Sequence, residues 1–472
     1  MDSAARGRLW LCLAAGLMTV AGCAGRHPLA DWSDRDLADR VRALDAGGGV
    51  DAAVDRGDDG TGDPAPAGAG QAWYVRAAMA SNAEIRAARQ RVERMRERVV
   101  GAGTLADPTA TTRFGQLAET AAGQVDYMVG VQQSLPFPGT LDARSEVARQ
   151  KVTEALYALE VTVADVEAAV RGAYWSMYAA THEAAVLGQN RELLLQIESS
   201  VRSRLRVGDA GQDDLLRVSR RLAALENQVA GLGQRQRTAG AMLNRLMSRG
   251  PGSTLPEPAV AGWEAAELDR DGLVGRAMRG NPQVRMAQAR VGTAHRELKL
   301  ARIEPLPDVV VGVQYGAVRA SGLSPVADGT DQIAATVGVT IPLWTEKYAA
   351  AEREALRGTG EAIAQVRAVQ DRAAFEVDDA LARIESHQDV LARVQEKMMP
   401  ESRQTIRLAL TAYEADDVDL LQLLDDWQSL LDDQVHEARI VAALHRAMAD
   451  LEKTLGGPVE ATATDDPAME LR

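Results

Sequence analysis

Hydrophobic and polar positions along this chain follow two different periods. Every second residue is apolar in four short stretches, and Val125, Tyr127, Val129 and Val131 show the pattern best, with Asp126 and Gly130 between them. An alternating pattern predicts β-strands whose two faces meet different surroundings. We therefore expect four strands in two pairs, within residues 109–117, 125–131, 309–315 and 333–341.

Much longer stretches have apolar residues at mixed spacings of three and four, as in Leu216, Leu222, Leu225, Val229 and Leu232. That spacing is typical of amphipathic helices in antiparallel coiled-coil packing. The expected helices cover residues 73–100, 142–207, 212–247, 347–399 and 419–455. We expect Pro400 to interrupt the fourth of them, because proline lacks a backbone N–H.

The same order of patterns occurs twice. Asn82-Ala83-Glu84-Ile85 returns as Asn281-Pro282-Gln283-Val284, and Leu135-Pro136-Phe137-Pro138 returns as Ile341-Pro342-Leu343-Trp344. A unit that joins one strand pair to about 100 Å of helix cannot bury its apolar faces alone, so it must stack on copies of itself. The predicted fold class is mostly α with a small β part, built from a duplicated strand-pair and long-helix repeat.

The N-terminus reads as an export signal. Arg6 and Arg8 precede an apolar run that ends in Val20-Ala21-Gly22-Cys23, the pattern of a bacterial lipoprotein signal with Cys23 as the lipid-attachment residue. The alternative is an ordinary secretory signal with a chance cysteine. Because the other cysteine, Cys12, would leave with the signal, neither a disulfide nor a thiolate metal site is expected.

These patterns predict six parts of the chain. They are a signal peptide (1–22), a lipidated N-terminus with a linker (23–72), the first repeat (73–250), a connector (251–270), the second repeat (271–456) and a tail (457–472). No stretch beyond the N-terminus has about 18 uninterrupted apolar residues, so no membrane-spanning helix is expected. The alternating strands have the length of tilted bilayer-crossing strands, although a half-buried strand of a soluble sandwich has the same pattern.

Charge and motifs exclude several function classes. The formal net charge of −14 argues against binding to nucleic acid. The chain has no P-loop, nucleophile elbow or glycine-rich dinucleotide turn, so we do not expect an enzyme or a cofactor. The six histidines have no i, i+4 spacing and no HExxH motif, so no metal site is expected.

Several segments in this order carry a resemblance to a known family. They are Gln133 to Leu141, Met399-Pro400-Glu401, Ala412-Tyr413 and Leu420 to Asp425. Over about residues 73–456 the chain resembles the TolC family of outer-membrane efflux channels, and the first segment resembles the heavy-metal branch of CusC and CzcC. The resemblance implies a homotrimer whose twelve-stranded β-barrel lies in the outer membrane and continues into a periplasmic α-helical barrel.

The resemblance also implies a function and partners. The chain would be the lipid-anchored exit duct of a tripartite RND-type pump in a Gram-negative bacterium, and would conduct substrate passively. Its partners would be outer-membrane lipid, a periplasmic adaptor and an inner-membrane RND transporter. Heavy-metal cations are one expected substrate class, and organic compounds or secretion are the alternative within the family. A non-channel alternative is a periplasmic coiled-coil lipoprotein that acts as a spacer.

The two periplasmic turns are the candidate sites. In the family, two aspartates at the start of the last helix ring the closed entrance, and counting from Tyr413 places them at Asp425 and Gln422. A family arginine that helps to lock the gate falls on Val418, so this chain lacks that residue. The predicted gate and acidic rim comprise Asp425, Gln422, Asp419, Asp417, Asp416 and Asp214, and the predicted adaptor contacts are Val207, Gly208, Glu414 and Ala415. The alternative for the acids, Asp213, Asp214 and Asp417 above all, is an ordinary role at a helix N-terminus.

Overall fold

The computed structural model describes residues 70–114, 119–120, 122–259, 262–263, 268–322 and 328–459. All of them fall in one compact unit, Gly62–Arg472. The predictions for Cys23, the signal peptide and most of the linker concern residues outside the described part.

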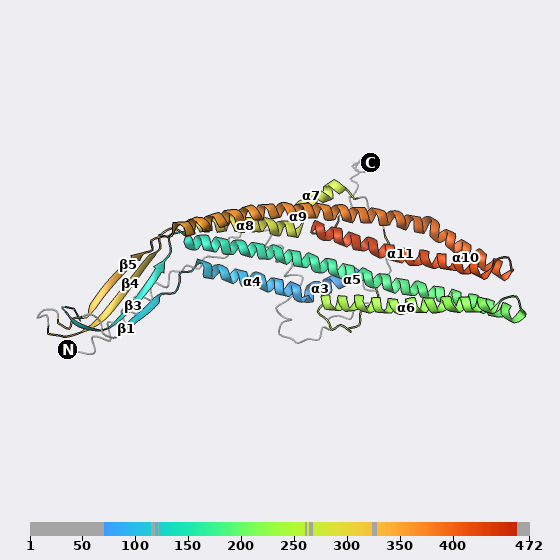
Figure 1. Ribbon diagram of the computed structural model, residues 1–472, viewed down its shortest axis with the longest axis horizontal. Helices are drawn as coiled ribbons and strands as arrows, with labels where there is room; N and C mark the ends of the chain where they lie inside the picture. Colours follow the sequence, from blue (N-terminus) through green and yellow to red (C-terminus); the bar gives the residue numbers. More distant parts are fainter. Residues whose placement is uncertain are drawn as a thin grey trace, which may run out of the picture. The chain divides into compact units, whose positions relative to one another are not determined.

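The first half of the described chain contains seven elements. They are α3 (Gln71–Ser81), α4 (Ala83–Gly103), β1 (Thr109–Phe114), β2 (Glu119–Thr120), β3 (Gly123–Leu135), α5 (Thr140–Val207) and α6 (Gln212–Leu246). The second half repeats the order with α7 (Arg270–Gly280), α8 (Pro282–Ile303), β4 (Val309–Arg319), β5 (Gln332–Val339), α9 (Thr345–Arg393), η3 (Val394–Met398), α10 (Met399–Glu414) and α11 (Leu420–Leu455). The duplication is therefore confirmed at the level of elements, and the two halves lie side by side (Figure 1).

The helix expected over 73–100 is in fact two helices, because Asn82 ends one and begins the next. The Asn82 Oδ1 atom accepts hydrogen bonds from the N–H groups of Glu84 (2.8 Å) and Ile85 (3.1 Å), as the N-cap of α4. Asn281 caps α8 in the same way, with bonds from Gln283 (2.7 Å) and Val284 (3.3 Å). The asparagine that recurs in both repeats thus marks the start of the corresponding helix in each, α4 after Asn82 and α8 after Asn281.

The predicted interruption at Pro400 is wrong. Helix α9 passes without a break through the five-residue π-helix η3 into α10, where Pro400 lies in the first turn. Proline is tolerated in a first turn, and the wider π-turn before it accommodates the missing N–H. Within the described residues, no helix is both long and apolar enough to cross a membrane.

The strands form one antiparallel sheet in the order β1-β3-β4-β5, with the short β2 paired to β3. Leu135 of β3 faces Val309 of β4, which in turn faces Val339 of β5. A bulge at Asp126 shifts the register between β3 and β4. Strands β1 and β5 are the two edges of this sheet, and β5 is exposed along its whole length.

Helix α5 is the central packing element, since α4, α6, α8 and α11 all pack against it. An aromatic cluster lies near its middle, where Tyr174, Trp175 and Tyr178 are buried together with Tyr74 of α3. The ring of Trp175 stacks on His445 of α11 at 3.8 Å between centroids. Elsewhere Val, Leu and Ala fill the helix contacts, which explains how a chain with few aromatics packs such long helices.

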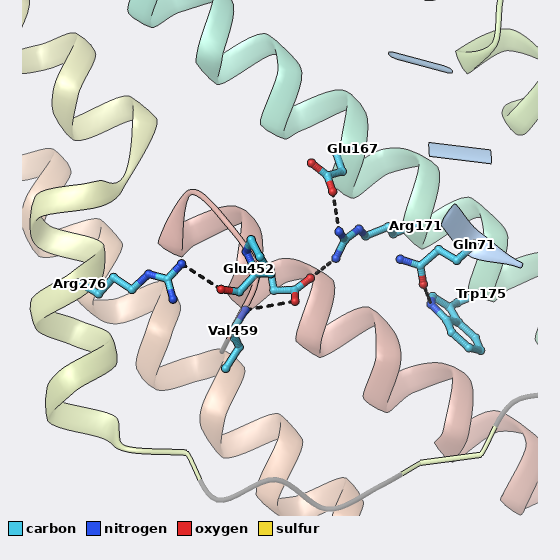
Figure 2. A network of polar contacts seen from close by, with 8 residues as sticks. Gln71, Glu167, Arg171, Trp175, Arg276, Glu452 and Val459 are labelled. Atoms are coloured by element: carbon cyan, nitrogen blue, oxygen red, sulfur yellow. Dashed lines mark hydrogen bonds and ion pairs between the residues drawn. The ribbon is translucent and has the colours of Figure 1, made fainter. Parts of the chain in front are cut away.

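A polar network beside this cluster joins three helices (Figure 2). Arg171 of α5 pairs with Glu167 one turn earlier, at 2.5 Å, and with Glu452 of α11. Glu452 also accepts from the backbone N–H of Val459 (3.3 Å), and Arg276 of α7 donates to the Pro458 carbonyl (2.9 Å). The network thereby ties the residues after α11 to α7 and to Glu452, which in turn pairs with Arg171 of α5.

Candidate functional site: the two helix turns

The first turn joins α5 to α6. Gly208 ends α5 in the left-handed region, with φ +91°, and the Asp209 N–H donates to the Arg204 carbonyl at 2.9 Å. Asp214 accepts from the Gly211 N–H at 3.1 Å and so caps α6. Val207 is 71% exposed and Leu216 is 60% exposed, so this turn presents apolar side chains to its surroundings.

The second turn joins α10 to α11. The Asp417 N–H donates to the Ala412 carbonyl at 2.9 Å, and Asp416 has a left-handed backbone with φ +65°. Asp419 accepts from the Gln422 N–H at 2.8 Å as the N-cap of α11. Left-handed backbone is uncommon outside glycine, although Asp tolerates it better than most residues. Both turns are therefore closed by side-chain caps at the start of the second helix.

Arg204, in the last turn of α5, ties the two turns together. Its guanidinium forms an ion pair with Asp416, donates to the Tyr413 carbonyl at 2.5 Å and lies 4.8 Å from the centroid of the Tyr413 ring. The hydrogen bond to Asp416 raises the pKa of Arg204 above its ordinary value. One cation thus contacts a carboxylate, a backbone carbonyl and an aromatic ring of the other hairpin.

Tyr413 is the buried residue of this contact. Burial raises the pKa of its hydroxyl, the Asp214 and Asp416 carboxylates add to the rise, and Arg204 opposes it. Asp214, Asp416 and Arg204 therefore all act electrostatically on one side chain. The structure brings these members of the two turns together, which spacing in the sequence could not show.

The predicted acidic residues have different local roles in the structure. Asp214 and Asp419 cap helices, and Asp416 pairs with Arg204. Gln422 is exposed and donates to Asp426 at 3.0 Å, one turn further along α11. Asp417 and Asp425 are exposed, and no ion pair involves their carboxylates within the described residues. At Asp214 and Asp419 the side chain bonds to the backbone at the start of a helix, which is the geometry that the helix-terminal alternative describes.

Sequence reasoning missed Arg204. The sequence has Val418 where the family has an arginine, and it does not show that a cation from the other hairpin reaches the same turn. The available signal was weak, because basic residues are common in the last turn of any helix. Val207, Gly208, Glu414 and Ala415, the predicted adaptor contacts, are all exposed at the turns.

Metal ligands do not gather in the described part of the chain, where no group of three or more His, Cys, Asp and Glu side chains could hold an ion. His445 is packed between Trp175 and Trp263 and bonds to the Gly262 carbonyl at 3.0 Å. Burial lowers the pKa of His445, which favours the neutral imidazole in this contact.

The arrangement of a small sheet and long paired helices is shared with solved structures of outer-membrane channels. Residues 273–457 match the family model described as "Outer membrane efflux protein". The chain is 26% identical over 351 residues to the pyoverdine export outer membrane protein OpmQ of Pseudomonas putida, over 72% of this chain and 69% of that protein. These findings confirm the resemblance to the outer-membrane efflux family.

Solved structures agree on the fold. The outer-membrane channel OprN matches with a TM-score of 0.71 at 18% identity, over 82% of this chain and 90% of that chain. CusC matches with a TM-score of 0.69 at 17% identity, over 82% of this chain and 92% of that chain. The two scores are nearly equal, so the fold does not separate a heavy-metal branch from the other branches.

Proposed function

We propose that this chain forms the exit duct of a tripartite efflux pump, as a homotrimer in the outer membrane of a Gram-negative bacterium. The observation that carries the proposal is the sheet with two open edges, set on a helical body that matches efflux channels. Unpaired strand edges are a liability unless another chain covers them. Three copies that join β1 to β5 would close twelve long strands into a barrel without edges.

The exposed residues of the sheet support a lipid-facing surface. Val311, Val313, Ile333, Val337 and Val339 are all more than a third exposed in one protomer. Leu343 and Trp344 follow at the start of α9 and are exposed by 72% and 76%. Aromatic and apolar residues at a strand end suit the level where a bilayer meets water. Lipid attached to Cys23 would add a tether on the periplasmic side.

The helix turns would be the periplasmic entrance. We propose that Asp417 and Asp425 supply the acidic rim of the gate, together with Gln422, and that Arg204 bound to Asp416 holds each protomer's two hairpins in the closed arrangement. Three copies would place six exposed carboxylates around one axis, which attracts cations within a Debye length of about 8 Å. Val207, Gly208, Glu414 and Ala415 would meet the adaptor, which links the duct to an inner-membrane RND transporter.

The substrate class has two candidates. The relative named for pyoverdine export favours an organic compound, whereas the junction at Gln133 to Leu141 favours heavy-metal cations. The lack of clustered metal ligands among the described residues gives the metal reading no separate support. Export assays of a strain that lacks its own exit duct, with a metal salt and an organic compound in parallel, would choose between them.

The first test is single-channel conductance of the purified oligomer in planar bilayers. Stable unitary steps support the duct, and Asp425→Asn should reduce the preference for cations over anions. Asp271→Asn on α7 is the matched control, since this exposed acid lies far along the chain from both turns. A well-folded oligomer that never conducts, even with Arg204→Ala at the turns, would favour the periplasmic spacer instead.

A further inference from the structure

The two faces of the sheet differ in chemistry. Phe114 of β1 is paired in register with Tyr127 of β3, and their ring centroids lie 6.4 Å apart. Val129, Val131 and Val313 continue this apolar face toward the helices. Because successive side chains of a strand point to opposite faces, the residues between them belong to the other face. With the apolar face on lipid, as proposed above, that other face is the lumen face of the barrel.

The lumen face is uncharged in the part nearest the helices. Two registered rows cross the four long strands on this face: Thr109, Gln132, Gly312 and Thr336, and then Thr111, Gly130, Gln314 and Ala334. The side chain of Gln314 covers Gly130, where an added Cβ would meet the Gln314 Cγ atom at 2.9 Å. Hydroxyl and amide groups thus line this part of the lumen face, and they offer hydrogen bonds to a solute of either charge.

Arg113 is the exception on the lumen face. The next row outward is Arg113, Met128, Gly316 and Gln332, the outermost row that all four long strands share. Arg113 is exposed, and neither an ion pair nor a side-chain hydrogen bond involves it within the described residues. Its neighbours in the row carry no charge, so they leave the positive charge of Arg113 uncompensated.

Three acids at the outer end of the sheet have other partners. Asp126, in the bulge of β3, pairs with Arg319 at 3.0 Å. Asp331, just before β5, accepts from the Tyr315 hydroxyl at 2.6 Å, and Tyr315 lies on the apolar face. Asp328 accepts from backbone N–H groups between β4 and β5, at 2.7–3.1 Å. None of these carboxylates forms an ion pair with Arg113 in the described part of the chain.

A fourth acid, Glu119, belongs to the short β2, where it is paired in register with Gln124. Along β3, Gln124 lies four residues beyond Met128, the partner of Arg113, which corresponds to roughly 13 Å of strand. The two positions are therefore further apart along the sheet than a Debye length of about 8 Å. Arg113 thus remains the charge that sets the sign of its row.

Closure of the barrel would bring three copies of Arg113 to one level. Twelve strands about 4.8 Å apart and tilted by about 40° enclose a barrel of roughly 12 Å radius, measured to the backbone. An extended arginine side chain bridges about half of that radius, so each guanidinium comes within about a Debye length of the barrel axis. A solute that leaves through the lumen must therefore pass close to all three charges.

We propose that the three Arg113 side chains form a cationic ring that binds anionic groups of the exported compound as it leaves the duct. Guanidinium groups bind carboxylates and phosphates through two parallel hydrogen bonds. The inference rests on the proposed duct and deepens it, because the ring favours an organic anion over a metal cation as the substrate. The 68 residues of α5 separate the sheet from the acidic rim proposed at the turns, so the two charged zones act separately.

Block of single-channel current from one side tests the ring in the full-length trimer. The probe is citrate, a trivalent anion, added to the chamber that the sheet end faces, in about 0.1 M KCl, where the Debye length is about 10 Å. Citrate should reduce the current of the parent channel, and Arg113→Gln should need several-fold more citrate for the same block. Arg113→Lys keeps the charge and should retain most of the block. The matched control, Arg94→Gln, removes an exposed arginine of α4 instead and should behave like the parent.

Three outcomes would overturn the ring. Equal block of the parent and of Arg113→Gln would mean that citrate binds elsewhere. An equal loss of block in Arg94→Gln would mean that only the net charge of the chain matters. Stronger block of the parent by hexaamminecobalt(III), a trivalent cation, than by citrate would mean that acids such as Glu119 set the sign of the charge at this end. In all three cases the unitary steps leave the proposed duct intact, whereas a trimer that never conducts would reject both the duct and the ring.

Discussion

Asn82 and Asn281 make the same three hydrogen bonds in the two halves of the chain. Each accepts two N–H groups as the cap of the following helix, and each donates from Nδ2 to a carbonyl at the end of another helix, 2.8 Å to Leu246 and 2.8 Å to Thr454. Both side chains are buried. One residue thus starts α4 or α8 and holds it against the end of α6 or α11.

Replacement of either asparagine should be costly. Asn82→Ala removes a helix cap and leaves the Leu246 carbonyl without its donor, for a combined loss of about 2–4 kcal/mol in the free energy of unfolding. Asn281→Ala should cost a similar amount. Urea unfolding followed by circular dichroism measures both. Asn82→Ser keeps a capping oxygen without facing the Leu246 carbonyl with a charge and should retain part of the stability, so equal losses for Ser and Ala would contradict the capping role.

Loss of Arg204 should open the entrance. Arg204→Ala removes the ion pair to Asp416, the bond to the Tyr413 carbonyl and the contact with the Tyr413 ring, so the open fraction of single channels should rise several-fold. Arg206→Ala is the control, since among the described residues that exposed side chain bonds only to Ser203 of its own helix. Asp416→Asn added to Arg204→Ala should change little more, because both substitutions break one contact. Fully additive effects would mean that the two residues act separately.

The network of Figure 2 should contribute to stability more than the surface ion pairs do. Arg171 and Glu452 have side-chain exposures of only 21% and 16%. Arg171→Ala leaves Glu452 with less compensation and should cost about 1.5–3 kcal/mol. Arg96→Ala, which breaks an exposed pair with Glu93, should cost at most about 1 kcal/mol. Thermal unfolding of both variants compares them, and similar losses would refute the difference.

Stability should fall as the pH drops below about 6.5, the ordinary pKa of histidine. Burial lowers the pKa of His445 and of His387 in the folded chain, so the unfolded chain binds protons more readily in this range. Protonation therefore favours unfolding from about pH 6.5 down to the lowered values, and the effect is absent at higher pH.

The variant His445→Phe isolates one source of this dependence. Phenylalanine keeps a ring against Trp175 but cannot titrate, so the urea midpoint of the variant should change less between pH 7.5 and 5.5 than that of the parent. His295→Phe is the control, because that histidine is exposed on α8. An unchanged pH dependence in His445→Phe would place its origin elsewhere.

Local patterns in the sequence predicted most of the elements in their order, although no predicted range covered α7, α8 or the short β2. Alternation found the strands, three-and-four spacing found the long helices, and the repeated Asn82 and Asn281 marked the duplication. These patterns can be read from the sequence alone, because the periods of strands and helices depend only on neighbouring residues. The same reasoning was wrong about Pro400. It applied the rule that proline interrupts a helix, whereas the π-turn before Pro400 accommodates this proline within one helix.

Contacts between distant residues could not be read in this way. Asp416 and Asp419 look alike in the sequence, yet one pairs with Arg204 of the other hairpin and the other caps its own helix. Which of these happens depends on how α5 and α10 are rotated and how far their ends reach. The rotation and the reach of these helices are both set by packing along α5 and α11. Many side chains buried there contact residues in the other half of the chain.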